Sequence, residues 1–130
     1  MGVRFPSSVS GVALASTGTG GENTAGQIAQ ISQAIDGQPF LILWEVQVTQ
    51  GAVPVNLTFL VRRGLGVTGT QIYSSGLVTG LATGTVQTYR GMVIESGAAG
   101  FSSPYTLTVN NNNSGTAVVF NQFAFAALAL

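Results

Sequence analysis

Two neighbouring stretches of this 130-residue sequence alternate between apolar and polar residues, and this feature constrains the fold most strongly. Residues 42–49 are apolar at every even position, with Trp44 among them, and residues 55–62 are apolar at every odd position, with Phe59 among them. A Gly- and Pro-containing break at residues 51–54 separates them. Successive side chains of a strand point to opposite faces, so a period of two predicts a strand with one buried face. We therefore predict two strands here, with Trp44 and Phe59 in the core.

Further short segments of β character follow, separated by turns rich in glycine or asparagine. The apolar spacing within residues 28–35 suits two turns of helix, but the same stretch also reads as a strand leading into the Asp36-Gly37 turn, and we prefer the strand. Short strands with Gly-rich turns and no long helical pattern predict an all-β fold, an antiparallel β-sandwich or jelly roll. The later predicted strands are residues 71–74, 77–81, 86–95, 105–109 and 116–125.

The N-terminal segment differs in composition from the rest of the chain. Residues 1–26 are mostly small and hydroxyl-bearing, so we predict an extended or flexible arm, followed by a β-sandwich domain at residues 27–130. Two interpretations of the arm stay open: a disordered terminus, or a segment that becomes ordered on a neighbouring chain. The anchors of such an arm would be Val3, Phe5, Val12 and Leu14, with Arg4 beside them.

Charged residues make up only 6% of the sequence, with a formal net charge of zero. Ordinary soluble domains carry about 25%, and near-zero net charge promotes association. A hydroxyl-rich monomer remains an alternative, but we favour a chain that is covered by partners. The four basic residues are all arginines, and only Arg62 and Arg63 are adjacent, which is too sparse for nucleic-acid binding. Arginine suits bidentate pairing across interfaces, so Arg62 and Arg63 are interface candidates.

The residue inventory argues against catalysis. The sequence has no histidine, no cysteine and no lysine, because all four of its basic residues are arginines. The usual activating base and the usual zinc ligands are therefore missing. Gly64, Gly66 and Gly69 match a dinucleotide-binding pattern, but a strand rather than a helix follows, so we predict a turn. We expect no enzyme activity, no cofactor and no metal. We also expect no membrane insertion, because no apolar stretch approaches about 20 residues.

Aromatic and apolar residues in the second half of the chain suggest contact surfaces. Tyr89, Phe101 and Tyr105 could line a carbohydrate platform, although packing in the core or in a loop is the commoner role. The last eight residues, 123–130, are apolar on both faces of a strand and include Phe123 and Phe125. Such a strand is buried on both sides, either in the centre of a sandwich or at a symmetric subunit interface. Phe123 and Phe125 are therefore interface candidates.

A small-residue arm followed by a Gly-, Thr- and Asn-rich sandwich with few charges resembles the capsid decoration (cement) proteins of tailed bacteriophages. The closing pattern is similar to the last strands of trimeric jelly-roll modules in phage fibres, spore-surface proteins and C1q/TNF-like domains. It consists of residues 104–109, an asparagine-rich turn and residues 118–125. The resemblance covers residues 27–130 in general character.

The resemblance implies a trimer on the capsid surface of a virion, with the major capsid protein or other structural subunits as partners. The arm would lie across a neighbouring capsomer, and the function would be to hold the shell together. Two alternatives remain open: a receptor- or glycan-binding fibre tip or surface module of the same fold, and a subunit of an extracellular filament whose arm is donated to the next subunit as a strand.

Overall fold

A computed structural model describes residues 4–12, 17–19, 21–32, 39–49, 55–79, 84–95, 102–112 and 117–129. These residues form strands and one short 3₁₀ turn, η1 (Gly66–Thr68), and no helix among them is long and apolar enough to cross a membrane. The strands in chain order are β1 (Arg4–Val12), β2 (Thr17–Thr19), β3 (Gly21–Ser32), β4 (Phe40–Thr49), β5 (Leu57–Arg63), β6 (Thr70–Ser74), β7 (Val86–Glu95), β8 (Ser102–Asn111) and β9 (Ala117–Ala129).

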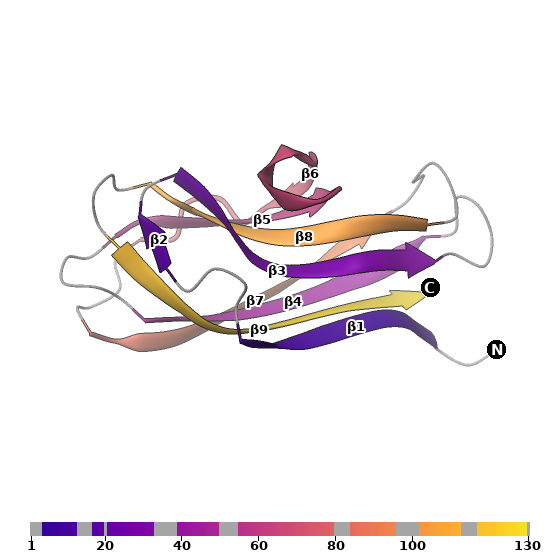
Figure 1. The fold of residues 1–130 in the computed structure, drawn as a ribbon, viewed down its shortest axis with the longest axis horizontal. Helices are drawn as coiled ribbons and strands as arrows, with labels where there is room; N and C mark the ends of the chain where they lie inside the picture. Colours follow the sequence, from indigo (N-terminus) through magenta and orange to yellow (C-terminus); the bar gives the residue numbers. More distant parts are fainter. Residues whose placement is uncertain are drawn as a thin grey trace.

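The strands form two antiparallel sheets that face each other (Figure 1). The first sheet has the order β1-β9-β4-β7, with β2 also paired to β9, and the second has the order β3-β8-β5-β6. From β3 onwards the chain crosses between the sheets at every connection except β5 to β6. Strands distant in sequence thus lie side by side, as in a double-sheet jelly roll. The predicted all-β sandwich of jelly-roll type is confirmed.

The core lies between the sheets and is built from the alternation that the sequence shows. The even positions of β4 from Ile42 to Val48 and the odd positions of β5 from Leu57 to Val61 point inward and are buried, with Trp44 and Phe59 among them, as predicted. The two rings stack, with centroids 5.4 Å apart. β8 and β9 complete the core with Tyr105, Leu107, Val109, Val118, Phe120, Phe123 and Phe125.

The prediction for residues 77–81 differs from the structure. Only an isolated bridge joins Val78 to Leu57, through two backbone hydrogen bonds of 2.8 and 2.9 Å, and residues 80–83 lie outside the described ranges. The reason is that β6 already pairs with β5 from Leu60 onwards, which leaves little free edge for another strand. The glycine pattern is a turn, as predicted. It links β5 to β6, and Gly64 and Gly66 adopt positive φ angles of 122° and 68°, which glycine tolerates best.

The N-terminal residues form part of the first sheet. β1 pairs with β9 from Arg4↔Ala129 to Val12↔Gln122, and β3 begins at Gly21 and continues past residue 26. The boundary that composition places at residue 26 therefore falls inside a strand. Arg4, Phe5 and Val12 lie in β1, but nothing of their side chains is described, and Val3, Leu14 and the Asp36-Gly37 turn lie outside the described residues.

Candidate interaction surface

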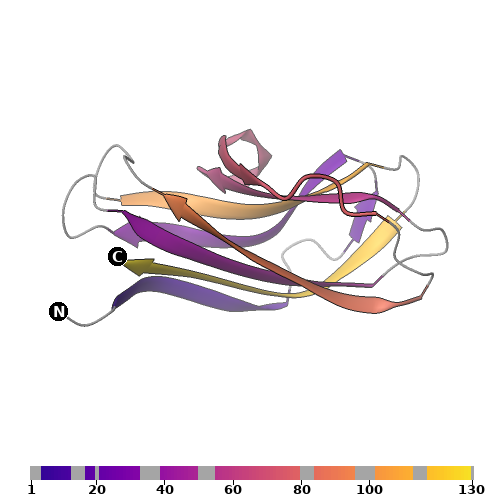
Figure 2. The ribbon, with the colours of Figure 1, turned by 180° about the vertical axis from the view of Figure 1, so that it is seen from behind.

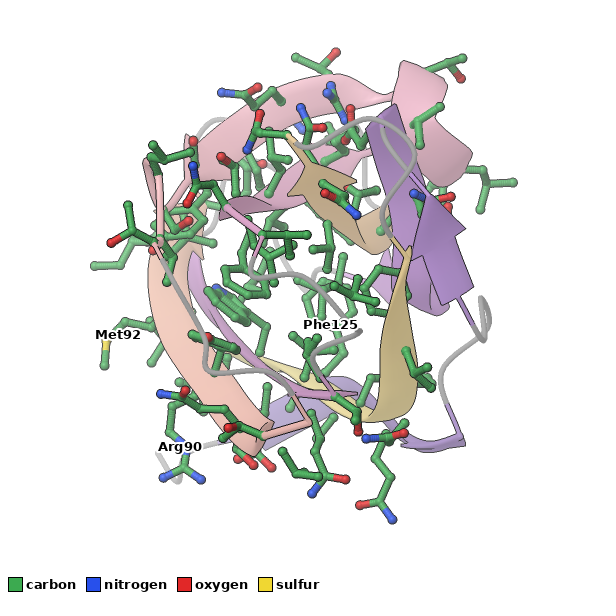
Figure 3. The ribbon with its side chains drawn as sticks, turned by 90° about the vertical axis from the view of Figure 1, so that its left-hand side faces the viewer. Arg90, Met92 and Phe125 are labelled. Atoms are coloured by element: carbon green, nitrogen blue, oxygen red, sulfur yellow. The ribbon has the colours of Figure 1, made fainter. Side chains whose placement is uncertain are left out.

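The outer face of the first sheet carries apolar side chains that nothing in the described structure covers. Residues of β4 and β7 that point away from the core face each other across the strand pair, Leu41 with Ile94 and Leu43 with Met92. Met92 and Ile94 are 62% and 63% exposed. Figure 3 shows Met92 pointing outward, whereas Phe125 points into the core. We call Leu41, Leu43, Met92, Ile94 and the neighbouring Ala126 of β9 the outer apolar patch.

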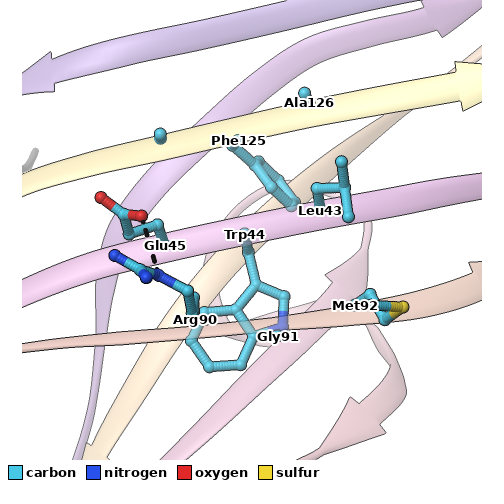
Figure 4. Close-up of a pocket in the computed structure, with 9 residues that line it drawn as sticks. Leu43, Trp44, Glu45, Arg90, Gly91, Met92, Phe125 and Ala126 are labelled. Carbon is cyan, nitrogen blue, oxygen red and sulfur yellow. Dashed lines mark hydrogen bonds and ion pairs between the residues drawn. The ribbon is translucent and has the colours of Figure 1, made fainter.

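A hollow of about 380 Å³ opens at one end of this patch and is lined in part by Leu43, Met92 and Ala126 (Figure 4). Leu43 and Met92 lie at one end of it, and Glu45 and Arg90 lie at the other. The lining residues are Leu43, Trp44, Glu45, Arg90, Gly91, Met92, Ala124, Phe125 and Ala126.

Gly91 is required beneath the hollow because it faces Trp44 across the strand pair. A Cβ atom at Gly91 would lie 2.6 Å from Cζ2 of the Trp44 indole. The indole is held on its other sides by Phe59 and by Tyr73, whose ring centroid is 6.0 Å away. The indole N–H is buried without a hydrogen-bond partner among the described residues. Close packing of the ring therefore takes precedence here over satisfaction of its one polar atom.

An exposed ion pair borders the outer apolar patch. Nε of Arg90 donates to Oε2 of Glu45 at 3.1 Å, and the side chains are 72% and 45% exposed. Solvent-exposed pairs of this kind contribute at most about 1 kcal/mol to stability. The pair therefore leaves one positive and one negative group available to a partner, side by side in the same cross-strand row.

Arg62 is used inside the chain. Its guanidinium donates to both carboxylate oxygens of Glu22, at 2.6 and 2.7 Å, and to the carbonyl of Gly69 at 2.8 Å. Thr108 also donates to Glu22. Partial burial opposes ionisation of Glu22, but the hydrogen bonds from Arg62 and Thr108 and the Arg62 charge outweigh it and hold the pKa of this carboxyl below its ordinary value of 4.5.

Arg63 is also paired inside the chain. It donates to the two oxygens of Glu95 at 3.1 and 2.7 Å, and Glu95 is only 5% exposed. The Tyr105 hydroxyl donates to the same carboxylate at 3.4 Å. Burial, together with the Glu95 charge, raises the pKa of Tyr105 to about 12. Arg62 and Arg63, predicted as interface residues, therefore have carboxylate partners from their own chain.

The outer side of the second sheet is covered by Glu22 and by the turn between β5 and β6. Thr106 and Thr108 of β8 are fully buried even though they point away from the core. The turn containing η1 lies against Thr106, since Gly66 N donates to the Thr106 hydroxyl at 3.0 Å and that hydroxyl donates to the Gly64 carbonyl at 2.8 Å, and Thr108 donates to Glu22. The outer apolar patch of the first sheet has no such cover among the described residues. The two outer faces thus differ in what protects them.

The remaining sequence-predicted contact residues are placed as follows. Phe123 and Phe125 point into the core and are buried, and Phe125 also forms part of the lining of the hollow. Tyr105 is buried too, and Tyr89 packs against Phe59 with centroids 4.6 Å apart, so neither presents an open ring face as a sugar platform would. Phe101 lies outside the described residues.

The outer apolar patch was not among the contact surfaces predicted from the sequence. Its signal is present in residues 40–44, which are apolar at every position, and in the apolar run Met92-Val-Ile94. A strand that is apolar on both faces is covered on both faces in the assembled state. The C-terminal strand is also apolar on both faces, and Ala124 and Ala126 are the residues of its outward face.

The sequence matches no protein-family model and no curated protein. Among solved structures, the chain is similar to VP2 of infectious bursal disease virus. The VP2 subviral particle matches 96% of this chain with a TM-score of 0.65 and 14% identity, and the Gx-strain virus matches 96% with a TM-score of 0.66 and 14% identity. The Gt-strain virus matches 95%, with a TM-score of 0.64 and 14% identity. The chain spans about a third of those proteins, 32% to 33% of their length. At this identity, the likeness establishes a shared fold.

Proposed function

We propose that this chain is a viral structural protein that decorates the surface of a capsid and stabilises the shell through contacts between subunits, acting as a trimer. The observation that carries the proposal is a jelly roll with an apolar outer face that none of the described residues covers. The likeness to VP2, which forms subviral particles, supports the viral context. The scarcity of charge supports a surface that is covered by partners.

The proposed mechanism is passive. Apolar area buried between subunits would supply most of the binding free energy, because Glu22 and Glu95 are taken up by partly buried pairs within the chain and only the Glu45–Arg90 pair is substantially exposed among the described side chains. Binding should therefore depend weakly on salt. Catalysis forms no part of the proposal, since the sequence offers neither histidine nor cysteine nor lysine. The partners would be further copies of this chain and a capsid subunit, without nucleic acid, lipid or cofactor.

The first test is the mass of the purified protein. Sedimentation velocity at low micromolar concentration should give a species about three times the chain mass of 13.3 kDa. A species with the mass of one chain would contradict the trimer.

The second test addresses the location of the protein. Immunogold labelling of particles purified from the source culture should place the protein on shells of regular size, and it should remain there in about 1 M NaCl, which screens exposed charge. Labelling confined to soluble fractions would contradict the capsid role. Release by salt alone would contradict the apolar mechanism.

A further inference from the structure

We infer that the outer apolar patch is the contact surface for a second copy of this chain, docked sheet against sheet about a two-fold axis that runs parallel to the strands between β4 and β7. The inference goes beyond the proposed function and does not need the protein to be viral. It follows from the order of side chains along the two strands, from the Glu45–Arg90 pair and from the size of the face.

The cross-strand rows define the geometry. On the outer face, Leu41 pairs with Ile94 and Leu43 with Met92, and the next row is Glu45 with Arg90. A two-fold axis along the strands and between them exchanges β4 with β7 while it keeps every row in place. Each apolar row then lies over the apolar row of the partner. Aligned packing of two sheets about 10 Å apart is a standard arrangement for such faces.

The same axis makes the charged row self-complementary. Glu45 of one copy lies over Arg90 of the other, and Arg90 lies over Glu45, so each charge keeps its partner in its own strand pair and gains a second across the contact. An axis perpendicular to the strands would not do this, because it would place the row over itself, Glu45 on Glu45, or over an apolar row. Charge complementarity therefore selects a second copy in one orientation.

The area indicates how strong the contact is. β4 and β7 each have ten residues, which gives a flat footprint of about 300 Å² for the two strands together. Stable interfaces bury about 800 Å² per partner. Protruding side chains add to the flat footprint, but the contact remains smaller than a stable interface, so we expect it to be weak. We expect association at protein concentrations above about 100 μM for the free protein. It would be stronger where other contacts already hold the copies together.

The test uses two charge-reversal variants of the full chain. Glu45→Arg gives one copy two positive groups in the charged row, and Arg90→Glu gives one copy two negative groups. Each variant alone should lose self-association by at least about tenfold in Kd, because like charges face each other in the contact. An equimolar mixture of the two should associate again, because each positive row then faces a negative row.

The readout is the weight-average mass from sedimentation equilibrium between about 10 μM and 1 mM. Gln71→Glu on the exposed edge of the second sheet is the matched control and should associate like the unchanged chain. Met92→Ser should weaken association without changing any charge. Far-UV circular dichroism checks that each variant is folded. We expect each of them to fold, because the substituted side chains are exposed.

Three results would overturn the inference: no rise in mass with concentration, variants that self-associate as the unchanged chain does, or a mixture no heavier than either variant alone. The mass at the low end of the range tests the trimer separately. A trimer without further association would leave the proposed function standing and refute the two-fold contact. A protein that has the mass of one chain at low concentration and of two chains at high concentration would support the two-fold contact and refute the trimer.

Discussion

Replacement of Gly91 by alanine should destabilise the fold, although the same change in most strands is stabilising. The added Cβ would lie 2.6 Å from Cζ2, 2.7 Å from Cε2 and 2.9 Å from Nε1 of Trp44. Favourable contacts between non-bonded carbons lie at about 3.5–4.0 Å. The indole has little room to retreat, because Phe59 stacks on it and Tyr73 packs against it.

Two opposing effects set the magnitude. Alanine is favoured over glycine in a strand by about 0.5–1 kcal/mol, because glycine loses more backbone freedom on folding. Overpacking of a filled core costs about 1–3 kcal/mol. The cost of overpacking is larger here, since three ring atoms of Trp44 would lie less than 3.0 Å from the added Cβ. We expect a net loss of about 1–2 kcal/mol in the free energy of unfolding.

A double-mutant cycle with Trp44→Leu isolates the contact. Leucine leaves space above residue 91, so Gly91→Ala in that background should be neutral or stabilising by up to about 1 kcal/mol. The coupling energy between the two positions should then be about 1–3 kcal/mol. Urea unfolding followed by far-UV circular dichroism measures all four proteins, whereas fluorescence does not, because Trp44 is the only tryptophan. All four must be compared at one protein concentration, since association shifts apparent stability. If Gly91→Ala costs the same in both backgrounds, the steric argument is wrong.

Three further predictions concern the ionisable groups. Glu95→Gln removes the charge-assisted hydrogen bonds of Arg63, whose side chain is 32% exposed and stays partly hydrated, and should cost about 1.5–3 kcal/mol in urea unfolding. Arg90→Gln at the exposed pair should cost less than about 1 kcal/mol; equal costs would refute the distinction. Because the pKa of Glu22 is lowered on folding, its contribution to stability is present above pH 4.5 and is lost as pH falls through the folded pKa, so Glu22→Gln should flatten stability against pH only in that acidic range. Because folding raises the pKa of Tyr105 from 10.0 to about 12, stability should fall between these values as the unfolded chain ionises first, and Tyr105→Phe should reduce that loss.

Local pattern was sufficient to predict several strands. The predicted strand at residues 86–95 matches β7, and residues 71–74 lie within β6, because alternation and glycine turns are encoded within a few neighbouring positions. Which strands become neighbours was not predictable in the same way. β9 lies between β1 and β4 but is far from both in the sequence: its Ala129 pairs with Arg4 of β1 and with Phe40 of β4, which are 125 and 89 positions away. Pairing of that kind depends on the whole chain.

The candidate surface shows the same division. Of the two open explanations for the apolar C-terminal strand, the sandwich centre describes the inner face of β9, and a subunit interface stays a prediction for the outer face. Phe123 and Phe125 point into the sandwich, whereas Ala124 and Ala126 point outward. The arginines were harder to interpret, because the carboxylate that pairs with Arg62 comes from a residue 40 positions away. Sequence indicates that Arg62 needs a partner, and only the folded chain identifies Glu22.

These pairings change what the low charge of the sequence implies. Three of the four acidic residues, Glu22, Glu45 and Glu95, each bind an arginine of the same chain. The first and last of these pairs hold the fold together, so among the described side chains only the Glu45–Arg90 pair is substantially exposed. Repulsion between like net charges normally keeps copies of a soluble protein apart, and such repulsion is weak in a chain of zero net charge. The remaining exposed pair is dipolar, so it favours one relative orientation of two copies, and it lies beside the apolar patch that such an encounter would bury.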